Sequence, residues 1–125
     1  MYLRSIMQCT LPSELLLQIA RDYGTPVYIY DASTINQQYK KLTDAFSLLP
    51  TRIFYACKAL TNIHILRYIN SLGCNIDCSS INEVKLALYA GVSPANILYT
   101  SNGVDFEEIV EAVEAGVHVL SLIHI

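Results

Sequence analysis

The sequence predicts an α/β fold that consists of the first three to four units of a parallel (β/α) barrel. Candidate strands begin at intervals of 22, 22 and 20 residues, near Ile53, Asn75, Ile97 and Val117. A helical pattern that ends at a glycine separates each candidate strand from the next. Strict alternation of strands and helices is typical of βαβ units and of a parallel sheet. A doubly wound sheet is the second choice, because no G-x-G-x-x-G run follows any strand.

The N-terminal elements precede this repeat. A helix is predicted over 11–23, where apolar residues recur at helical spacing and Gly24 can form the C-terminal cap. The β-rich run 25–30 predicts a strand. Asp31 can then cap a second helix over 32–47.

Three more helices are predicted within the repeat, over 62–72, 81–90 and 106–115. Asn62 can cap the first of them. Ser80 and Asp105 each precede a glutamate by three residues, which is the spacing of a capping box. These caps fix where each helix begins, just after a strand.

Composition restricts the class of protein. The chain has 125 residues, of which 53% are hydrophobic and 15% charged, and its net charge is −3. These values favour a globular domain over a disordered segment. No apolar run reaches the roughly 20 residues that span a bilayer, no secretory signal begins the chain, and no basic cluster indicates a nucleic-acid partner. We therefore expect a cytoplasmic protein without a membrane or nucleic-acid partner.

The four cysteines do not form a C-x-x-C pair. A zinc site that combines Cys74 and Cys78 with His64 or His118 is an alternative with little support from spacing. A thiol within an apolar strand is more often a small core residue. We interpret all four, Cys9 included, as reduced and structural, and expect no metal site.

Lys58 is the most informative single residue, because it combines a positive charge with the end of an apolar strand. An unpaired ammonium is costly to bury, and an amine removed from water becomes a neutral nucleophile suited to Schiff-base chemistry. The alternative is a lysine that extends to solvent where the strand leaves the core.

Other polar groups follow the neighbouring strands. Carboxyl ends of parallel strands meet at one edge, so we expect Asp77 to lie within reach of Lys58. Glu83 lies one turn into the next helix, where its place in a capping box with Ser80 is the competing explanation. The third strand ends in Thr100-Ser101-Asn102.

These segments resemble a known family. The run 54–59, Phe-Tyr-Ala-Cys-Lys-Ala, is similar to the Y-A-x-K-A motif of fold-type III pyridoxal-phosphate enzymes, the alanine-racemase-like TIM-type barrels that include diaminopimelate, ornithine and arginine decarboxylases. Residues 76–83 resemble that group's D-x-x-S-x-x-E motif. Residues 24–31, 98–102 and 115–119 are similar to the diaminopimelate branch in particular. Leu60 departs from the usual Lys-Ala-Asn, which affects a contact near the cofactor.

The resemblance implies an activity and a set of roles. Lys58 would be the Schiff-base lysine of pyridoxal 5'-phosphate, Asp77 would contact the lysine and its cofactor surroundings, and Glu83 would support that arrangement. The substrate would be a small amino acid, meso-diaminopimelate, decarboxylated to lysine. The strand over 25–30 would belong to a separate β-domain, and active sites would form across a homodimer.

The resemblance also implies a division of the chain. Residues 1–31 would hold the N-terminal helix and the β-domain strand, and residues 32–119 the first part of the cofactor-binding barrel. Residues 120–125 resemble a translated sequencing adapter, which indicates a non-native tail. The phosphate loop and several other cofactor contacts are expected beyond Val119, so we expect the chain alone to be inactive. The alternatives are an ornithine- or arginine-type decarboxylase and a non-catalytic cofactor-binding barrel.

Overall fold

The first of two compact units contains a helix, an extended segment and the start of a second helix. The structure is a computed structural model that describes residues 11–101 and 103–119. It divides into one unit up to Gln38 and another from Tyr39 onward. Helix α1 (Ser13–Tyr23) ends at Gly24, whose φ of 80° favours glycine and whose N–H donates to the Ala20 carbonyl at 3.0 Å. The predicted glycine cap is therefore confirmed.

The predicted strand over 25–30 is not formed. These residues are extended and exposed, and no strand is assigned to them. A β-rich segment needs neighbouring strands, because an isolated strand leaves its backbone N–H and C=O groups unpaired. Helix α2 (Ala32–Ala45) follows, and the Asp31 carboxylate accepts the Ser33 N–H at 2.9 Å, as an N-terminal cap should. Membership of 25–30 in a separate β-domain stays a prediction.

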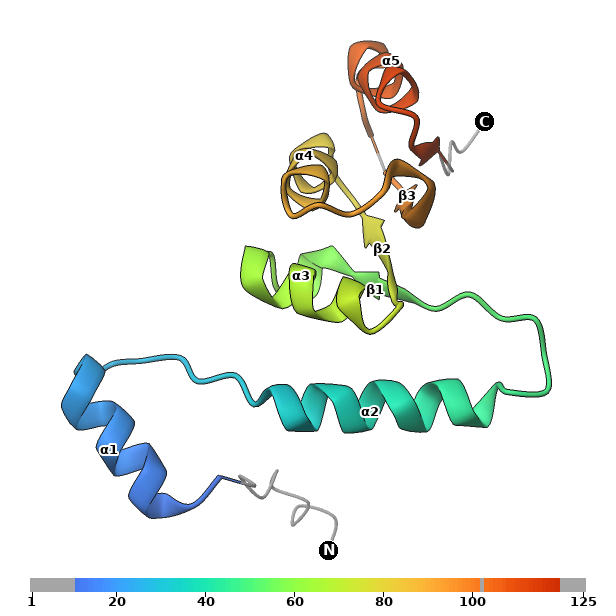
Figure 1. Cartoon of the computed structure of the whole chain (residues 1–125). Helices are drawn as coiled ribbons and strands as arrows, with labels where there is room; N and C mark the ends of the chain where they lie inside the picture. The colour runs from blue at the N-terminus through green and yellow to red at the C-terminus, as the bar shows by residue number, and fades with distance from the viewer. Residues whose placement is uncertain (1–10, 102, 120–125) are drawn as a thin grey trace, which may run out of the picture. The chain divides into compact units, whose positions relative to one another are not determined.

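The second unit contains a four-stranded parallel sheet whose strands lie in chain order (Figure 1). Its strands are β1 (Phe54–Ala56), β2 (Asn75–Cys78), β3 (Ile97–Tyr99) and β4 (His118–Val119). Helices α3 (Ile63–Ser71), α4 (Ile81–Tyr89) and α5 (Phe106–Glu114) connect them, with short 3₁₀ turns at η1 (Cys57–Ala59) and η2 (Pro94–Asn96). Parallel strands added in one direction are the start of a (β/α) barrel, so the predicted fold class is confirmed.

The two faces of the sheet differ in their surroundings. Ile76 and Ile97 are in register on one face and are fully buried, and helix α4 packs against both of their strands. Asp77, Leu98 and His118 lie in register on the opposite face, where each is half-buried or exposed. The core therefore lies between the sheet and its helices, and the other face carries the polar side chains.

Arg52 links segments at the amino end of the sheet through its side chain. Its guanidinium donates to Asn75 Oδ1 at 3.1 Å and to the Ala95 carbonyl at 3.0 Å, and it lies 5.3 Å from the centre of the Phe54 ring. These contacts connect the start of β1 to β2 and to the turn before β3. The sequence analysis did not single out this residue, because its partners come from distant segments.

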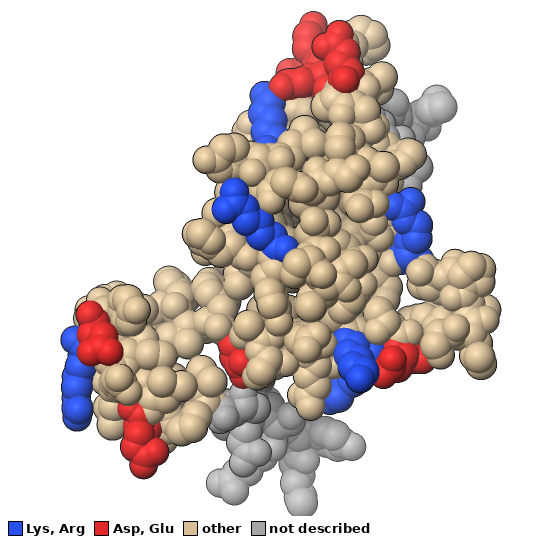
Figure 2. Space-filling model, viewed as in Figure 1, with Lys and Arg blue, Asp and Glu red and all other residues tan. Residues whose placement is uncertain are grey.

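Charge gathers most clearly on α5, where Figure 2 shows a group of acidic side chains. Glu111 pairs with Lys85 of α4 at 2.8 Å, and both side chains are about half exposed. An ion pair that is so exposed to solvent adds little to the stability of the fold. No helix within 11–101 and 103–119 is both long enough and apolar enough to cross a membrane.

Candidate functional site

Lys58 lies in the 3₁₀ turn that directly follows β1. The turn is closed by a hydrogen bond from the Leu60 N–H to the Cys57 carbonyl at 3.1 Å. The predicted position at a strand end is confirmed. The expected burial is not, because Lys58 is exposed. Its amine is therefore open to a small molecule at the carboxyl edge of the sheet.

Asp77 lies one strand away, in register with Ala56 of β1. Its Oδ1 accepts a hydrogen bond from the Thr100 hydroxyl at 2.5 Å. No ion pair joins Lys58 to Asp77 in the part of the chain that the structure describes, and the expectation that Asp77 lies within reach of Lys58 stays a prediction. Lys58 and Thr100 each lie two residues beyond a register partner of Asp77, which is Ala56 on β1 and Leu98 on β3. The chain turns into η1 at Cys57, before it reaches Lys58.

Glu83 lies in the first turn of α4 and holds the preceding loop. Its Oε2 accepts the Ser79 N–H at 2.7 Å and the Ser79 hydroxyl at 3.1 Å, while its own N–H donates to Ser80 Oγ at 3.3 Å. The capping box predicted with Ser80 is thus half formed, because the carboxylate reaches one residue further back. Glu83 fixes the loop that follows Asp77 and Cys78, and its support of Lys58 stays a prediction.

The other two predicted caps have different outcomes. Asn62 Oδ1 accepts the N–H groups of His64 at 2.9 Å and Ile65 at 3.3 Å, so this cap is confirmed. The Asp105 side chain makes no cap hydrogen bond to α5, so the second capping box is wrong. All three helices still begin at the carboxyl edge of the sheet, where helix N-termini favour negative charge.

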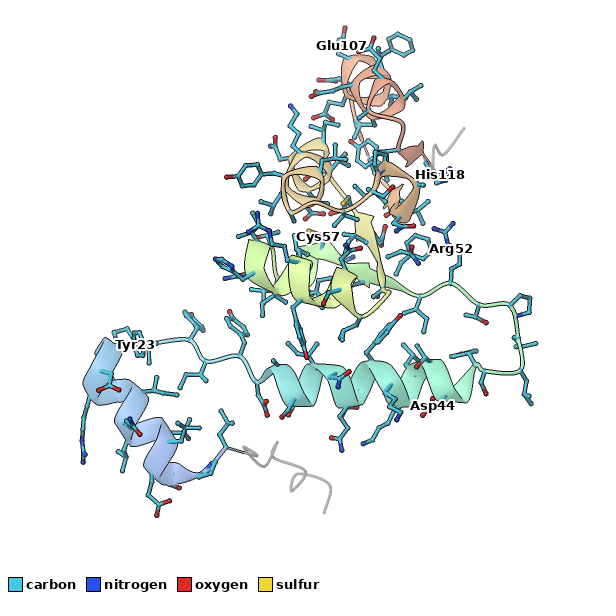
Figure 3. The ribbon with its side chains drawn as sticks, viewed as in Figure 1. Tyr23, Asp44, Arg52, Cys57, Glu107 and His118 are labelled. Atoms are coloured by element: carbon cyan, nitrogen blue, oxygen red, sulfur yellow. The ribbon has the colours of Figure 1, made fainter. Side chains whose placement is uncertain are left out.

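Two thiols lie behind this edge, on the side covered by helices. Cys57 directly follows β1 as the first residue of η1, Cys78 is the last residue of β2, and both are fully buried (Figure 3 labels Cys57). Their sulfur atoms and a carboxylate oxygen of Glu83 all lie within 4.8 Å of one another. Burial, followed by the charge of Glu83, raises the pKa of Cys57 to about 11, and burial raises the pKa of Cys78. Both thiols therefore stay protonated near neutral pH.

The sequence analysis did not find this grouping. Its signal was the distance of 21 positions between Cys57 and Cys78, close to the length of one strand-helix unit, which brings such residues side by side. Cys74 is buried but lies outside the cluster, as do His64 and His118 among the described residues. Cys9, Asn102 and the tail over 120–125 lie outside the described residues.

The chemistry open to this edge is that of an accessible primary amine and of a carboxylate that the Thr100 hydroxyl holds in place. A primary amine can bind the aldehyde carbon of pyridoxal phosphate covalently. The exposed Lys58 therefore fits the aldehyde end of that cofactor, while Asp77, held by Thr100, is a fixed acceptor at the same edge.

Comparison with known proteins agrees with this chemistry. The family described as "Pyridoxal-dependent decarboxylase, pyridoxal binding domain" matches residues 32–123. The curated diaminopimelate decarboxylase of Methanothermobacter thermautotrophicus is 41% identical over 105 residues, which cover 82% of this chain and 24% of that protein. The chain thus spans about a quarter of the length of the curated relatives it matches.

Solved structures share the fold. Diaminopimelate decarboxylase from Helicobacter pylori, complexed with L-lysine, gives a TM-score of 0.79 at 31% identity, covering 85% of this chain and 27% of that one. Lysine/ornithine decarboxylase from Vibrio vulnificus, complexed with putrescine, gives 0.75 at 27% identity, covering 83% and 28%. The family match takes in β1 to β4 and all of the candidate site, so the chain belongs to the pyridoxal-binding domain family of the pyridoxal-dependent decarboxylases, whose cofactor is pyridoxal 5'-phosphate.

Proposed function

We propose that the protein to which this chain belongs decarboxylates meso-diaminopimelate to lysine and carbon dioxide, with Lys58 as the residue that binds the cofactor. The observation that carries the proposal is the exposed Lys58 amine at the carboxyl edge of β1, within a segment 41% identical to a diaminopimelate decarboxylase. Active sites of (β/α) barrels lie at this edge.

The residues of the chain have distinct roles in this proposal. When bound, the cofactor supplies an electron sink for the carbanion left by departing carbon dioxide. Lys58 would hold the cofactor through its Nζ, and its amine would be the group that moves protons at the substrate's amine. Asp77 faces the same edge as a fixed carboxylate, oriented by the Thr100 hydroxyl. Glu83 keeps the loop at Ser79 in place and so positions the end of β2.

A second function is favoured by one comparison. The Vibrio vulnificus lysine/ornithine decarboxylase has the same fold at 27% identity, and its putrescine is a smaller amine without a carboxylate. An ornithine- or arginine-type decarboxylase would use the same Lys58. A barrel that binds the cofactor without turnover is the remaining alternative.

The assembly and location are also proposals. We infer a homodimer, because the resemblance implies active sites completed by a second copy. We also infer a small amino acid as substrate and a cytoplasmic location, in keeping with the mildly acidic composition.

The test measures carbon dioxide release by a protein in which this chain is extended to the length of its relatives, called the extended protein below. We expect release from meso-diaminopimelate and none above background from ornithine or arginine. Comparable turnover of ornithine would support the second function and leave Lys58 in its role. Stoichiometric cofactor binding without release from any of the three would support the non-catalytic barrel.

A further inference from the structure

The cluster of Cys57, Cys78 and Glu83 has the composition of a metal site that no part of the proposed function requires. One ligand atom from each residue lies within 4.8 Å of the other two. The three residues come from the turn after β1, the end of β2 and the first turn of α4. The positions of the three residues are therefore set by two neighbouring strands and by helix α4, which packs against the sheet.

The types of ligand atom at this cluster suit a soft divalent cation. Zinc-class ions take thiolate and carboxylate ligands together. The metal deprotonates the thiols that it binds, so binding here would release protons.

The Glu83 carboxylate is held by the loop that precedes its helix. Glu83 Oε2 accepts two hydrogen bonds from Ser79, which fix the orientation of the carboxylate. Among the described residues none donates to the other oxygen, Oε1. Glu83 is half-buried, whereas both cysteines are fully buried. Partners that orient a ligand in this way are a usual part of metal sites.

We propose that Cys57, Cys78 and Glu83 bind a divalent cation of the zinc class, with a fourth coordination position open. Two thiolates and one carboxylate suit Zn²⁺ and exclude Mg²⁺ and Ca²⁺, which prefer oxygen ligands alone. The site lies on the helix-covered side of the sheet, whereas Asp77 lies on the opposite face. This proposal does not depend on the proposed function.

The test is zinc binding to the extended protein, kept reduced by a phosphine that does not chelate zinc. Competition with a chromophoric zinc chelator gives stoichiometry and affinity, and Cd²⁺ gives the thiolate-to-metal absorption band. We expect one ion per chain, bound with release of about two protons because both thiols ionise. The Cd²⁺ band should report two thiolates.

Variants separate the cluster from other ligands. Replacing a residue that only orients a metal ligand lowers metal affinity by about 10- to 100-fold. Replacing a ligand itself should cost at least as much, so we expect the zinc affinity to fall by at least about tenfold in Cys57→Ser, Cys78→Ser and Glu83→Gln. Cys74→Ser is the matched control, because this buried cysteine lies outside the cluster, and its affinity should be unchanged. Far-ultraviolet circular dichroism checks that each variant keeps its secondary structure.

Three results would overturn the proposal. The first is no stoichiometric zinc binding by the reduced, unmodified extended protein at micromolar concentration. The second is binding that Cys78→Ser leaves intact. The third is equal loss of binding in Cys74→Ser and Cys57→Ser with circular dichroism unchanged. None of these results bears on decarboxylation, which is measured separately on the extended protein.

Discussion

Lys58 and Asp77 show what single residues allowed us to predict. Because Lys58 and Asp77 lie at the ends of successive strands, the sequence places both at one edge of the sheet. The register of Ala56 with Asp77 confirms that placement. Which partner Asp77 takes could not be predicted, because that depends on where β1 ends. The chain turns into a 3₁₀ helix at Cys57, so Thr100 rather than Lys58 meets the carboxylate.

The first residue-level prediction is that Lys58 alone carries the cofactor. Borohydride reduction of the extended protein with bound cofactor, followed by peptide mapping, should label Lys58, and Lys58→Ala should abolish the label. Lys85 is the matched control, because it is also exposed but lies in an ion pair on α4. A label on Lys85 or on Lys40 would show the assignment to be wrong.

The second residue-level prediction concerns the hydrogen bond between Thr100 and Asp77. A hydrogen bond to a charged group contributes about 1.5–3 kcal/mol, so Thr100→Val should lower kcat/KM of the extended protein by about tenfold or more if Asp77 acts at the site. In the Asp77→Ala variant, Thr100→Val should lower kcat/KM almost no further, because the two residues act as a unit.

Thr43→Val is the control for this cycle, because the Thr43 hydroxyl donates only to the Lys40 carbonyl on an exposed helix surface. Its kcat/KM should equal that of the unmodified protein. Additive effects of Asp77→Ala and Thr100→Val would mean that Thr100 does not position Asp77.

The elements of the repeat were predicted more completely than the elements before it. Apolar periodicity and glycine stops place α3, α4 and α5 to within a residue or two of their observed ends. These signals are local, so the sequence alone contains them. The prediction of a strand over 25–30 failed because a strand must pair with residues distant in the sequence, and β-propensity carries no information about such partners.

The caps give a prediction for the helices. Removing an N-cap costs about 1 kcal/mol, which corresponds to roughly fivefold faster local opening. Asn62→Ala should therefore speed hydrogen exchange of the His64 and Ile65 amides about fivefold. Asp105→Ala is the matched change at α5, where no cap hydrogen bond exists, and should have a clearly smaller effect on that helix's first turn. Equal acceleration in both helices would contradict the difference between the two caps.

At the scale of the whole molecule, β1 and β4 are the edges of the sheet, and no strand within residues 11–101 and 103–119 pairs with their outer sides. A closed barrel has no such edges, because each edge strand pairs with the next. The face that carries Asp77 and Leu98 is half-buried where a complete barrel would fill its interior with side chains. Local signals could predict the units of this barrel, but no local signal in these residues specifies the strands that close it.

The last prediction is that the 125-residue chain by itself self-associates and releases no carbon dioxide from meso-diaminopimelate. The open edges offer unpaired N–H and C=O groups to a second copy, and large apolar side chains such as Leu48 and Leu49 are 96% and 63% exposed. Sedimentation velocity over a range of concentrations should show species larger than a monomer. The extended protein is the comparison, and it should be active under the same conditions. A monodisperse monomer that binds pyridoxal phosphate stoichiometrically and releases carbon dioxide would show that the closing strands are not needed for a working site.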